Sequence, residues 1–539
     1  MDALSAVVGR ESLARLSGRK MNSSGSRAAA AFGMLFGLLS ASSPSQADQA
    51  LVDRGAYLAR AGDCEACHTA AAGGRPYAGG DAINSPFGPI YPPNITPDKT
   101  NGIGAWSDDD FYRAMHDGVG KHGQYLYPAF PYQWFTKVTR DDVLAIRAYL
   151  DTVPPVDVAS KPTRLRFPFD VRTGLGVWDE AYFKPGEFKP DPAKSQQWNR
   201  GAYLVEGLGH CGDCHTPKNL AMAPENAKAF SGGQIDDWYA PDITSDPSRG
   251  IGKWSDGELF KYLKDGTARG QGVVVGPMAQ VVHDSLAKLT DDDIHAIVAY
   301  LEATPPIADY KAVALSQPDG AHAVGATVYL GHCASCHQQN GEGRPGVVPA
   351  LAGNGLVTAK GPENVIRVIL QGRLATANFA PMPAVGSEMT DEEIAEVADY
   401  VRNAWSNAAP WITKSDLVAD IRAKTKSTLS GEGANGEQSD PCGPGDYASV
   451  TPIPDPGDKI KTTLESMKDL STLSTIQTLI ADARQASPDI SQADIVNGLT
   501  LAYCHVEMRA GALSKPNGRP RLNQFALLVY SELTSKGQE

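Results

Sequence analysis

The stretch RGAYLARAGDCEACHT, Arg54–Thr69, occurs a second time, with few changes, as RGAYLVEGLGHCGDCHT, Arg200–Thr216. A shorter form, GATVYLGHCASCHQ, begins at Gly325. The segment NITPDKTNGIGAWSDDDF from Asn94 also returns, as DITSDPSRGIGKWSDGEL from Asp242, at a constant offset of 148 residues. Internal repeats at this spacing predict a chain built from units that fold in the same way.

Each repeat contains one C-x-x-C-H sequence, and together these sequences hold six of the eight cysteines: Cys64, Cys67 and His68; Cys211, Cys214 and His215; Cys333, Cys336 and His337. In an exported chain this spacing is typical of c-type haem attachment, in which the two thiols bond the haem vinyl groups and the histidine binds iron. A thioredoxin-like redox pair or half a zinc site also uses C-x-x-C, but neither needs a histidine directly after the second cysteine in all three repeats. The sequence therefore predicts three covalently bound haem c groups.

The N-terminal segment predicts export. The apolar run AAAAFGMLFGLL, residues 28–39, follows several basic residues and precedes the small-residue site around Ser45 and Ala47. This order is typical of a secretory signal peptide, which we predict over residues 1–47. The run is too short to span a bilayer. With 539 residues and a net charge of −13, the chain has room for several domains and lacks the basic balance of a nucleic-acid-binding protein.

Each repeat closes on a segment that begins like a capped helix, with threonine followed three residues later by an acidic residue: TRDDVLAIRAYL from Thr139, TDDDIHAIVAYL from Thr290 and TDEEIAEVADYV from Thr390. In the second of these segments, the apolar residues Ile294, Ile297, Val298 and Leu301 recur at helical spacing. We interpret that stripe as core.

The order of helix, C-x-x-C-H sequence, Gly/Pro-rich loop and closing helix resembles class I cytochrome c. The resemblance implies an all-α fold in which the first and last helices cross and a loop methionine supplies the sixth iron ligand. We therefore predict three tandem class I cytochrome c-like domains over 48–190, 191–312 and 313–411. A linker over 412–455 and a small helical C-terminal appendage over 456–539 complete the prediction.

Two methionines occupy the expected loop positions. Met278 lies in VGPMAQ of the second repeat and Met382 in APMPAV of the third, so both are predicted sixth ligands; Met389 is the alternative in the third repeat. A methionine thioether raises the iron reduction potential, whereas a second histidine lowers it.

The first repeat has LYPAFPYQWF, Leu126–Phe135, at this position. Aligning Trp106 with Trp254 puts Phe130 opposite Met278, and phenylalanine cannot bind iron. His116, His122 and Met115 are nearby alternatives, and the site could also stay open. We predict His116, which makes the first haem bis-histidine and the lowest in potential.

Residues 48–411 resemble the multihaem cytochrome c subunits of periplasmic membrane-bound dehydrogenases that oxidise alcohols, aldehydes or gluconate. The residues that carry this resemblance are the three C-x-x-C-H sequences, RGAYL, NITPD, GIGAW, LYPAFPY and CGDCHTPKN. It implies a partner, a large dehydrogenase subunit that holds pyrroloquinoline quinone, flavin or a molybdenum cofactor. The cytochrome subunit would relay electrons to membrane quinone or an oxidase, as a peripheral protein in the periplasm at the outer face of the inner membrane. Phe130 departs from the alcohol-dehydrogenase pattern, which has methionine, and makes a molybdenum-type partner a serious candidate.

The remaining cysteines, Cys442 and Cys504, lie outside these motifs. In an oxidising compartment an even pair predicts a disulfide. Two other functions remain open. One is a peroxidase-like haem enzyme that uses an open first haem, although the aromatic LYPAFPY segment fits this poorly. The other is a cytochrome subunit of a terminal oxidase.

Overall fold

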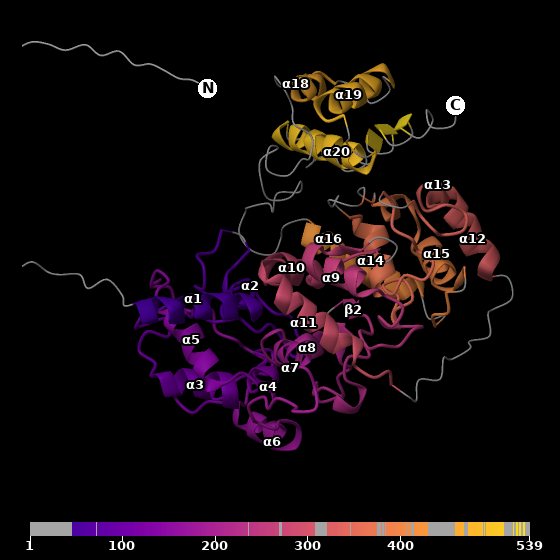
Figure 1. The fold of residues 1–539 in the computed structure, drawn as a ribbon. Coiled ribbons are helices and arrows are strands. Elements are labelled where there is room, and N and C mark those ends of the chain that lie inside the picture. Colours follow the sequence, from indigo (N-terminus) through magenta and orange to yellow (C-terminus); the bar gives the residue numbers. More distant parts are fainter. Residues whose placement is uncertain are drawn as a thin grey trace, which may run out of the picture. The chain divides into compact units, whose positions relative to one another are not determined.

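A computed structural model describes residues 46–307 except 72, 236 and 269–271, residues 321–429 except 345, 346, 374–378, 380, 381, 383, 406 and 411–413, and residues 459–510 except 468–472, 489 and 491, together with 521, 524, 525, 528, 529, 532 and 533. Helices dominate these residues, with two short antiparallel strand pairs (Figure 1). The all-α prediction is confirmed in this coarse form. Of the predicted signal segment, only Gln46 and Ala47 are described, and they begin the first helix.

Residues 46–190 form what we call the first unit. Its elements are α1 (Gln46–Ala61), α2 (Cys64–His68), α3 (Asp108–Asp117), α4 (Tyr132–Phe135), α5 (Arg140–Leu150) and α6 (Thr173–Tyr182). The capping predicted from sequence is present, because the Thr139 side chain accepts a hydrogen bond from the backbone of Asp142. This fixes the start of α5, which packs against α1.

Residues 191–307 form the second unit. Its helices are α7 (Gln196–Tyr203), the π-helix η1 (Leu204–Leu208), α8 (Cys211–His215), η2 (Asn226–Lys228), α9 (Asp256–Asp265), α10 (Pro277–Asp284), η3 (Leu286–Lys288) and α11 (Asp291–Glu302). Its antiparallel strand pairs are β1 (Gly233–Ile235) with β2 (Trp238–Ala240), and β3 (Thr267–Ala268) with β4 (Gly272–Val273). Ile294, Ile297, Val298 and Leu301 of α11 are buried, as the helical stripe predicts.

Residues 321–429 form the third unit, and residues 459–533 a separate helical region. The third unit contains α12 (Ala321–His332), α13 (Ala334–His337), α14 (Glu363–Gln371), η4 (Val385–Glu388), α15 (Asp391–Asn403) and α16 (Ser415–Leu429). The helical region contains α18 (Lys459–Ser466), α19 (Leu473–Ala486) and α20 (Gln492–Arg509), which enclose an apolar core of their own. Cys504, in α20, is disulfide-bonded. Its predicted partner, Cys442, lies outside the described residues. No helix in the described ranges is long and apolar enough to cross a membrane.

A glycine at the same position of each repeat permits the same close helix crossing in all three units. In each unit the first long helix crosses the closing helix, as α1 with α5, α7 with α11 and α12 with α15. A Cβ atom added to the glycine would collide with a backbone oxygen of the closing helix, at 1.8 Å (Gly55 to Ala145), 1.9 Å (Gly201 to Ala296) and 2.4 Å (Gly325 to Glu396). Only glycine therefore permits backbones this close.

The tyrosine of RGAYL joins the first unit to the second. Tyr57, in α1, donates a 2.5 Å hydrogen bond to Asp293 at the start of α11 and accepts one from the backbone N–H of Thr290. Arg200, in α7, pairs with the same Asp293 at 2.7 Å. A matching set of contacts leads from the second unit back to the first. Tyr203 of α7 donates to Asp142 at 2.6 Å and accepts from the N–H of Thr139, while Arg54 pairs with Asp142 at 2.5 Å.

These two sets relate the first and second units by a local two-fold arrangement, since each unit caps the closing helix of the other. The third unit has Val324 and Thr327 where RGAYL has arginine and tyrosine. Its closing helix begins with a capping box formed by its own Thr390 and Glu393.

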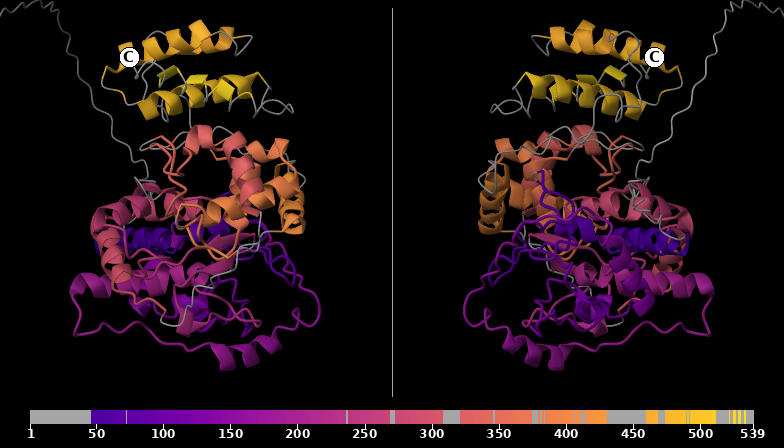
Figure 2. Two further views of the ribbon diagram at one scale, coloured as in Figure 1. Left: turned by 90° about the vertical axis from the view of Figure 1, so that its right-hand side faces the viewer. Right: turned by 90° about the vertical axis from the view of Figure 1, so that its left-hand side faces the viewer.

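Different contacts connect the third unit to the second. Asn364 of α14 accepts from the backbone N–H of Tyr239 at 3.0 Å and donates to its carbonyl at 2.8 Å. Arg367 pairs with Asp237 at 2.6 Å. Figure 2 shows the orange helices of the third unit next to the second unit in two further views.

Candidate haem-binding sites

Each C-x-x-C-H sequence forms a short helix that ends on its histidine, as α2, α8 and α13. The histidine Nδ1 lies within hydrogen-bond distance of a proline carbonyl, at 2.7 Å (His68 to Pro93), 2.7 Å (His215 to Pro241) and 3.1 Å (His337 to Pro349). When Nδ1–H donates to a carbonyl, the tautomer is fixed and Nε2 keeps the lone pair that a metal needs. The three sites thus share one arrangement for presenting Nε2.

Burial keeps these histidines neutral. It lowers the pKa of His68 and of His215, and it lowers the pKa of His337 to about 4. A neutral imidazole is the form that binds iron.

In the first two sites, the residue after the proline makes side-chain hydrogen bonds that hold the carbonyl partner of the histidine in place. Asn94 directly follows Pro93 and donates to the carbonyls of Val156 and Val158 at 2.7 and 3.0 Å. Its counterpart Asp242 follows Pro241 and accepts from the backbone and hydroxyl of Thr244 at 2.8 and 2.6 Å. The NITPD and DITSD repeats therefore position the carbonyl partner of the histidine. Sequence reasoning missed this role, although the proline before each repeat was a visible signal.

Burial favours the protonated form of five of the six motif thiols. Burial raises the pKa of Cys64, Cys211, Cys214 and Cys333 to about 12 and that of Cys67 to about 11. Redox-active C-x-x-C pairs have the opposite property, a lowered thiol pKa that favours the thiolate. This argues against a thioredoxin-like role.

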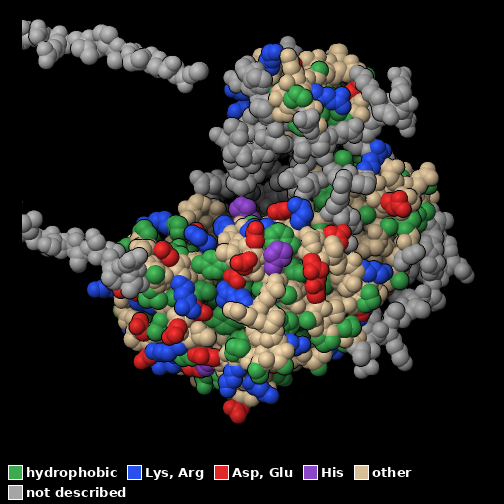
Figure 3. Space-filling model, in the orientation of Figure 1, with side chains coloured by type: hydrophobic (Ala, Val, Ile, Leu, Met, Phe, Trp, Pro, Cys, Tyr) green, Lys and Arg blue, Asp and Glu red, His purple; other side chains and the backbone are tan. Residues whose placement is uncertain are grey.

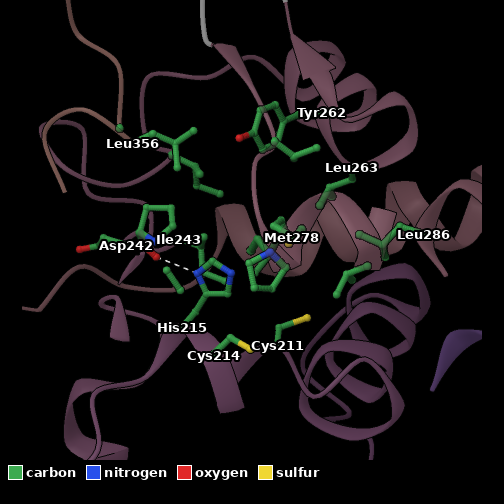
Figure 4. Close-up of a pocket in the computed structure, with 18 of the residues that line it drawn as sticks. Cys211, Cys214, His215, Asp242, Ile243, Tyr262, Leu263, Met278, Leu286 and Leu356 are labelled. Atoms are coloured by element: carbon green, nitrogen blue, oxygen red, sulfur yellow. Dashed lines mark hydrogen bonds between the residues drawn. The ribbon is translucent and has the colours of Figure 1, made fainter. Parts of the chain in front are cut away.

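An apolar cavity lies beside the motif of the second unit. Its lining includes Cys211, Cys214 and His215 on one side, Leu259, Tyr262 and Leu263 from α9, and Met278 at the start of α10. Figure 4 shows His215 and Met278 directed into this cavity, with both cysteines beside the histidine. Sequence reasoning expected Met278 in this place.

Both neighbouring units complete this cavity. Ala61 and Asp63, directly before Cys64, line it from the first unit, and Asn354 and Leu356 line it from the third. No sequence signal predicts these four residues, because they reach the cavity only through the packing of the units.

Comparison with known proteins identifies the family to which this chain belongs. The cytochrome c family model matches residues 52–154 and 323–405. The fructose dehydrogenase cytochrome subunit of Gluconobacter japonicus is 40% identical over 71% of this chain and 85% of its own length. The chain belongs to the family of dehydrogenase cytochrome c subunits.

Two further relatives of this cytochrome c subunit are named for different substrates. The cytochrome c subunit of alcohol dehydrogenase (quinone) from Gluconacetobacter polyoxogenes is 39% identical over 76% of this chain and 91% of its own length. The cytochrome c subunit of gluconate 2-dehydrogenase from Pantoea cypripedii is 39% identical over 70% and 90%. Because the three identities are nearly equal, they single out no substrate.

The cytochrome c family binds haem c covalently, and the residues of the second site fit that group. Two adjacent thiols, a neutral histidine with Nε2 available, an apolar cavity and a methionine thioether are all directed at one space. The chemistry of this donor set is that of a histidine–methionine haem site.

The first site of this cytochrome c subunit differs at Phe130. This residue is half-buried and packs edge to face on Phe135, with ring centroids 5.4 Å apart. Of the α9 positions that line the second cavity, Leu263 corresponds to Met115, which is buried in the core of the first unit. His116 corresponds to Lys264, which is not part of that lining.

His116 lies in the last turn of α3, where its Nδ1 is 2.7 Å from Asp117 and its ring stacks on Tyr112. His122 is exposed. Neither contact occupies the Nε2 atom of His116, so its assignment as sixth ligand stays a prediction. Met115 is the alternative, because its counterpart Leu263 lines the cavity of the second unit.

In the third unit, Met382 is half-buried against the apolar core, and its backbone pairs with that of Arg373 at 2.8 and 2.9 Å. Met389 is buried within that core. The contacts of Met389 are those of a packing residue, and Met382 remains the predicted ligand.

Proposed function

We propose that this chain carries three covalently attached haem c groups in three tandem class I cytochrome c-like domains. We also propose that it relays electrons from a periplasmic dehydrogenase of the alcohol or aldehyde class to membrane quinone or an oxidase. The observation that carries the proposal is the cavity of the second unit, which is lined from all three units. A relay needs cofactors close to one another, and this cavity brings the middle site against both of its neighbours.

Haem c supplies one-electron transfer at its iron when bound. The chain's own residues do the rest. The cysteine pairs would attach the group, the histidines His68, His215 and His337 would bind its iron through Nε2, and Met278 and Met382 would each offer a thioether. His116 is the proposed sixth ligand of the first site.

The middle position of the second site follows from two short connections. Asp63 lines the cavity of the second site and is bonded directly to Cys64 of the first motif. On the other side, the chain runs only seven residues from Pro349, the carbonyl partner of His337, to Leu356 in the cavity wall. Both outer sites are therefore tied to the middle one through short stretches of backbone.

The proposed partner is a large dehydrogenase subunit that holds pyrroloquinoline quinone, flavin or a molybdenum cofactor. The names of the relatives support a dehydrogenase subunit as partner. We place the complex in the periplasm, peripherally attached to the outer face of the inner membrane.

The test is to purify the native complex from membranes, identify the proteins that co-elute and weigh the chain. We expect a mass increase of three haems, and two after Cys211→Ser with Cys214→Ser. A co-eluting dehydrogenase whose substrate produces the reduced α-band would support the relay. The proposal fails if the chain elutes alone and no alcohol, aldehyde or sugar acid reduces it when dehydrogenase fractions are added back.

A further inference from the structure

The connection that follows the first unit's closing helix presents apolar side chains to solvent. Eleven large apolar side chains are exposed among the described residues, and six of them fall within residues 158–182: Val158, Phe167, Phe169, Val171, Val177 and Tyr182. Phe167 is 82% exposed and Val177 75%. Scattered apolar residues are normal on a protein surface, but here more than half of the exposed ones fall within one segment of 25 residues.

The backbone of this segment is held in place. Arg166 donates its N–H to the carbonyl of Phe87 at 3.0 Å, and the Tyr127 hydroxyl donates to the carbonyl of Phe169 at 3.1 Å. Arg172 donates to the carbonyl of Tyr125 at 2.8 Å. The exposure of Phe167 and Val177 is therefore a feature of an anchored segment rather than of a loose one.

Basic residues accompany the exposed apolar ones. Residues 160–172 contain four basic residues and one acidic, a net charge of +3 within a chain of net charge −13. Arg164 and Arg166 are exposed and form no ion pair with any described residue. On the face drawn in Figure 3, acidic and basic side chains are interspersed. Residues 160–172 thus combine a local positive charge with exposed aromatic rings, and Asp179 and Glu180, which follow in α6, bring the net charge of residues 158–182 to +1.

The segment also lies against the first site. Tyr125 and Tyr127, which hold it, belong to the loop that contains Phe130, and Tyr132, which also holds it, begins α4 directly after that loop. At its end, α6 is fixed by the hydrogen bond from Tyr132 to Asp179 at 2.6 Å and by the indole of Trp178, which donates to the carbonyl of Ala221 at 2.8 Å. Figures 1 and 2 both show α6 at the outer margin of the first and second units.

We propose that residues 158–182 form the surface on which this chain rests on an anionic lipid bilayer, with the first site nearest the membrane. Aromatic and aliphatic tips flanked by lysine and arginine match the boundary between acyl chains and negatively charged headgroups. A segment at the outer margin of the units can lie on a broad lipid surface, because its exposed side chains can each insert into the bilayer separately. This inference rests on the proposed peripheral placement of the chain at a membrane.

The test is co-sedimentation of the purified full chain, haems attached, with vesicles. One set is phosphatidylcholine alone, and the other is equal parts phosphatidylcholine and phosphatidylglycerol. We expect binding to the anionic set only, weakened by salt. Arg164→Gln with Arg166→Gln is expected to reduce this binding about thirtyfold, since each basic residue near an anionic surface contributes about 1 kcal/mol.

A second variant, Phe167→Ser with Val177→Ser, tests the apolar part and is expected to reduce binding about tenfold or more. Matched controls use exposed residues elsewhere. Arg75→Gln with Lys99→Gln removes the same charge from the first unit, and Val324→Ser with Leu330→Ser removes exposed apolar side chains from the third. Both controls should bind as the wild type does.

Three results would overturn the proposal. The wild-type chain could bind neither vesicle, or it could bind both sets equally. Alternatively, the Arg164/Arg166 variant could keep vesicle binding but lose the dehydrogenase subunit in detergent, which would assign the surface to that partner. Substrate-driven haem reduction in detergent is measured alongside. If the substrate does not reduce the haems of the wild-type protein, the relay function is refuted, and this result has no bearing on lipid binding.

Discussion

At the residue scale, Phe130 distinguishes the first site from the second. It takes the place of Met278 at the same offset of 148 residues that relates α3 to α9. The chain around it keeps the histidine, its carbonyl partner and the two cysteines. One side chain therefore removes a thioether from an otherwise matching set.

Phe130→Met is expected to restore that thioether and to raise the reduction potential of the first site. Methionine ligation favours the reduced state, whereas a second histidine disfavours it. The measurement is a redox titration with the near-infrared charge-transfer band of methionine-ligated ferric haem, which should gain intensity by about half, from two sites to three. Met278→Phe is the matched exchange and should lower the band by the same amount. An unchanged band in Phe130→Met would contradict this expectation, and a wild-type band with the intensity of three methionine-ligated sites would show that Met115 already binds there.

At the element scale, the helix crossing depends on a glycine. A Cβ on Gly201 would lie 1.9 Å from the carbonyl oxygen of Ala296 and 2.8 Å from the Cβ of Tyr300. Gly201→Ala must therefore push α7 away from α11, and overpacking of this kind costs about 1–3 kcal/mol or more. Hydrogen exchange of the α7 and α11 amides should accelerate.

Gly257→Ala provides the control, because Gly257 lies in α9 with no atom within 4 Å of an added Cβ. Alanine is there expected to stabilise the helix by about 0.5–1 kcal/mol. Equal effects of the two substitutions would show that helix propensity, and not the crossing, determines the glycine.

At the scale of the whole molecule, the Tyr57–Asp293–Arg200 set couples the first unit to the second. Burial raises the pKa of Asp293, but the hydrogen bonds from Arg200 and Tyr57 outweigh it, and the net pKa is lowered. A carboxyl group with a lowered folded-state pKa stabilises the fold above its unfolded value of about 3.9, and this contribution is lost as the pH falls through the folded pKa. The contact between units should therefore weaken below about pH 4.

Tyr57→Phe is expected to cost about 1.5–3 kcal/mol at neutral pH, because its hydroxyl donates to a charged carboxylate. This cost is measured as the change in the free energy of unfolding in urea, together with the hydrogen-exchange protection of the α1 and α11 amides. In an Asp293→Asn background the same substitution should cost less, and the loss of stability between pH 5 and pH 3 should shrink. Tyr182→Phe, at an exposed tyrosine, is the control. Equal costs of Tyr57→Phe in both backgrounds would refute the coupling.

The sequence by itself determined what local chemistry fixes. Three C-x-x-C-H sequences predicted the attachment residues, Thr139, Thr290 and Thr390 predicted the caps, and the stripe of α11 predicted its buried face. The repeats predicted the two thioether positions and the exception at Phe130. The motifs, the caps and the stripe depend on residues a few positions apart, and the repeats depend on a constant offset of 148 residues; both kinds of spacing are visible in a sequence.

Only the tertiary structure decided which distant residues meet. It showed that Tyr57 reaches Asp293, that the carbonyls of Pro93 and Pro241 face the histidines, and that Asp63 and Leu356 complete the second cavity. It also showed that residues 158–182 hold apolar side chains outward. These contacts join segments separated by many residues, and the packing of three similar units determines them. A repeated pattern predicts the units but not the faces through which they meet.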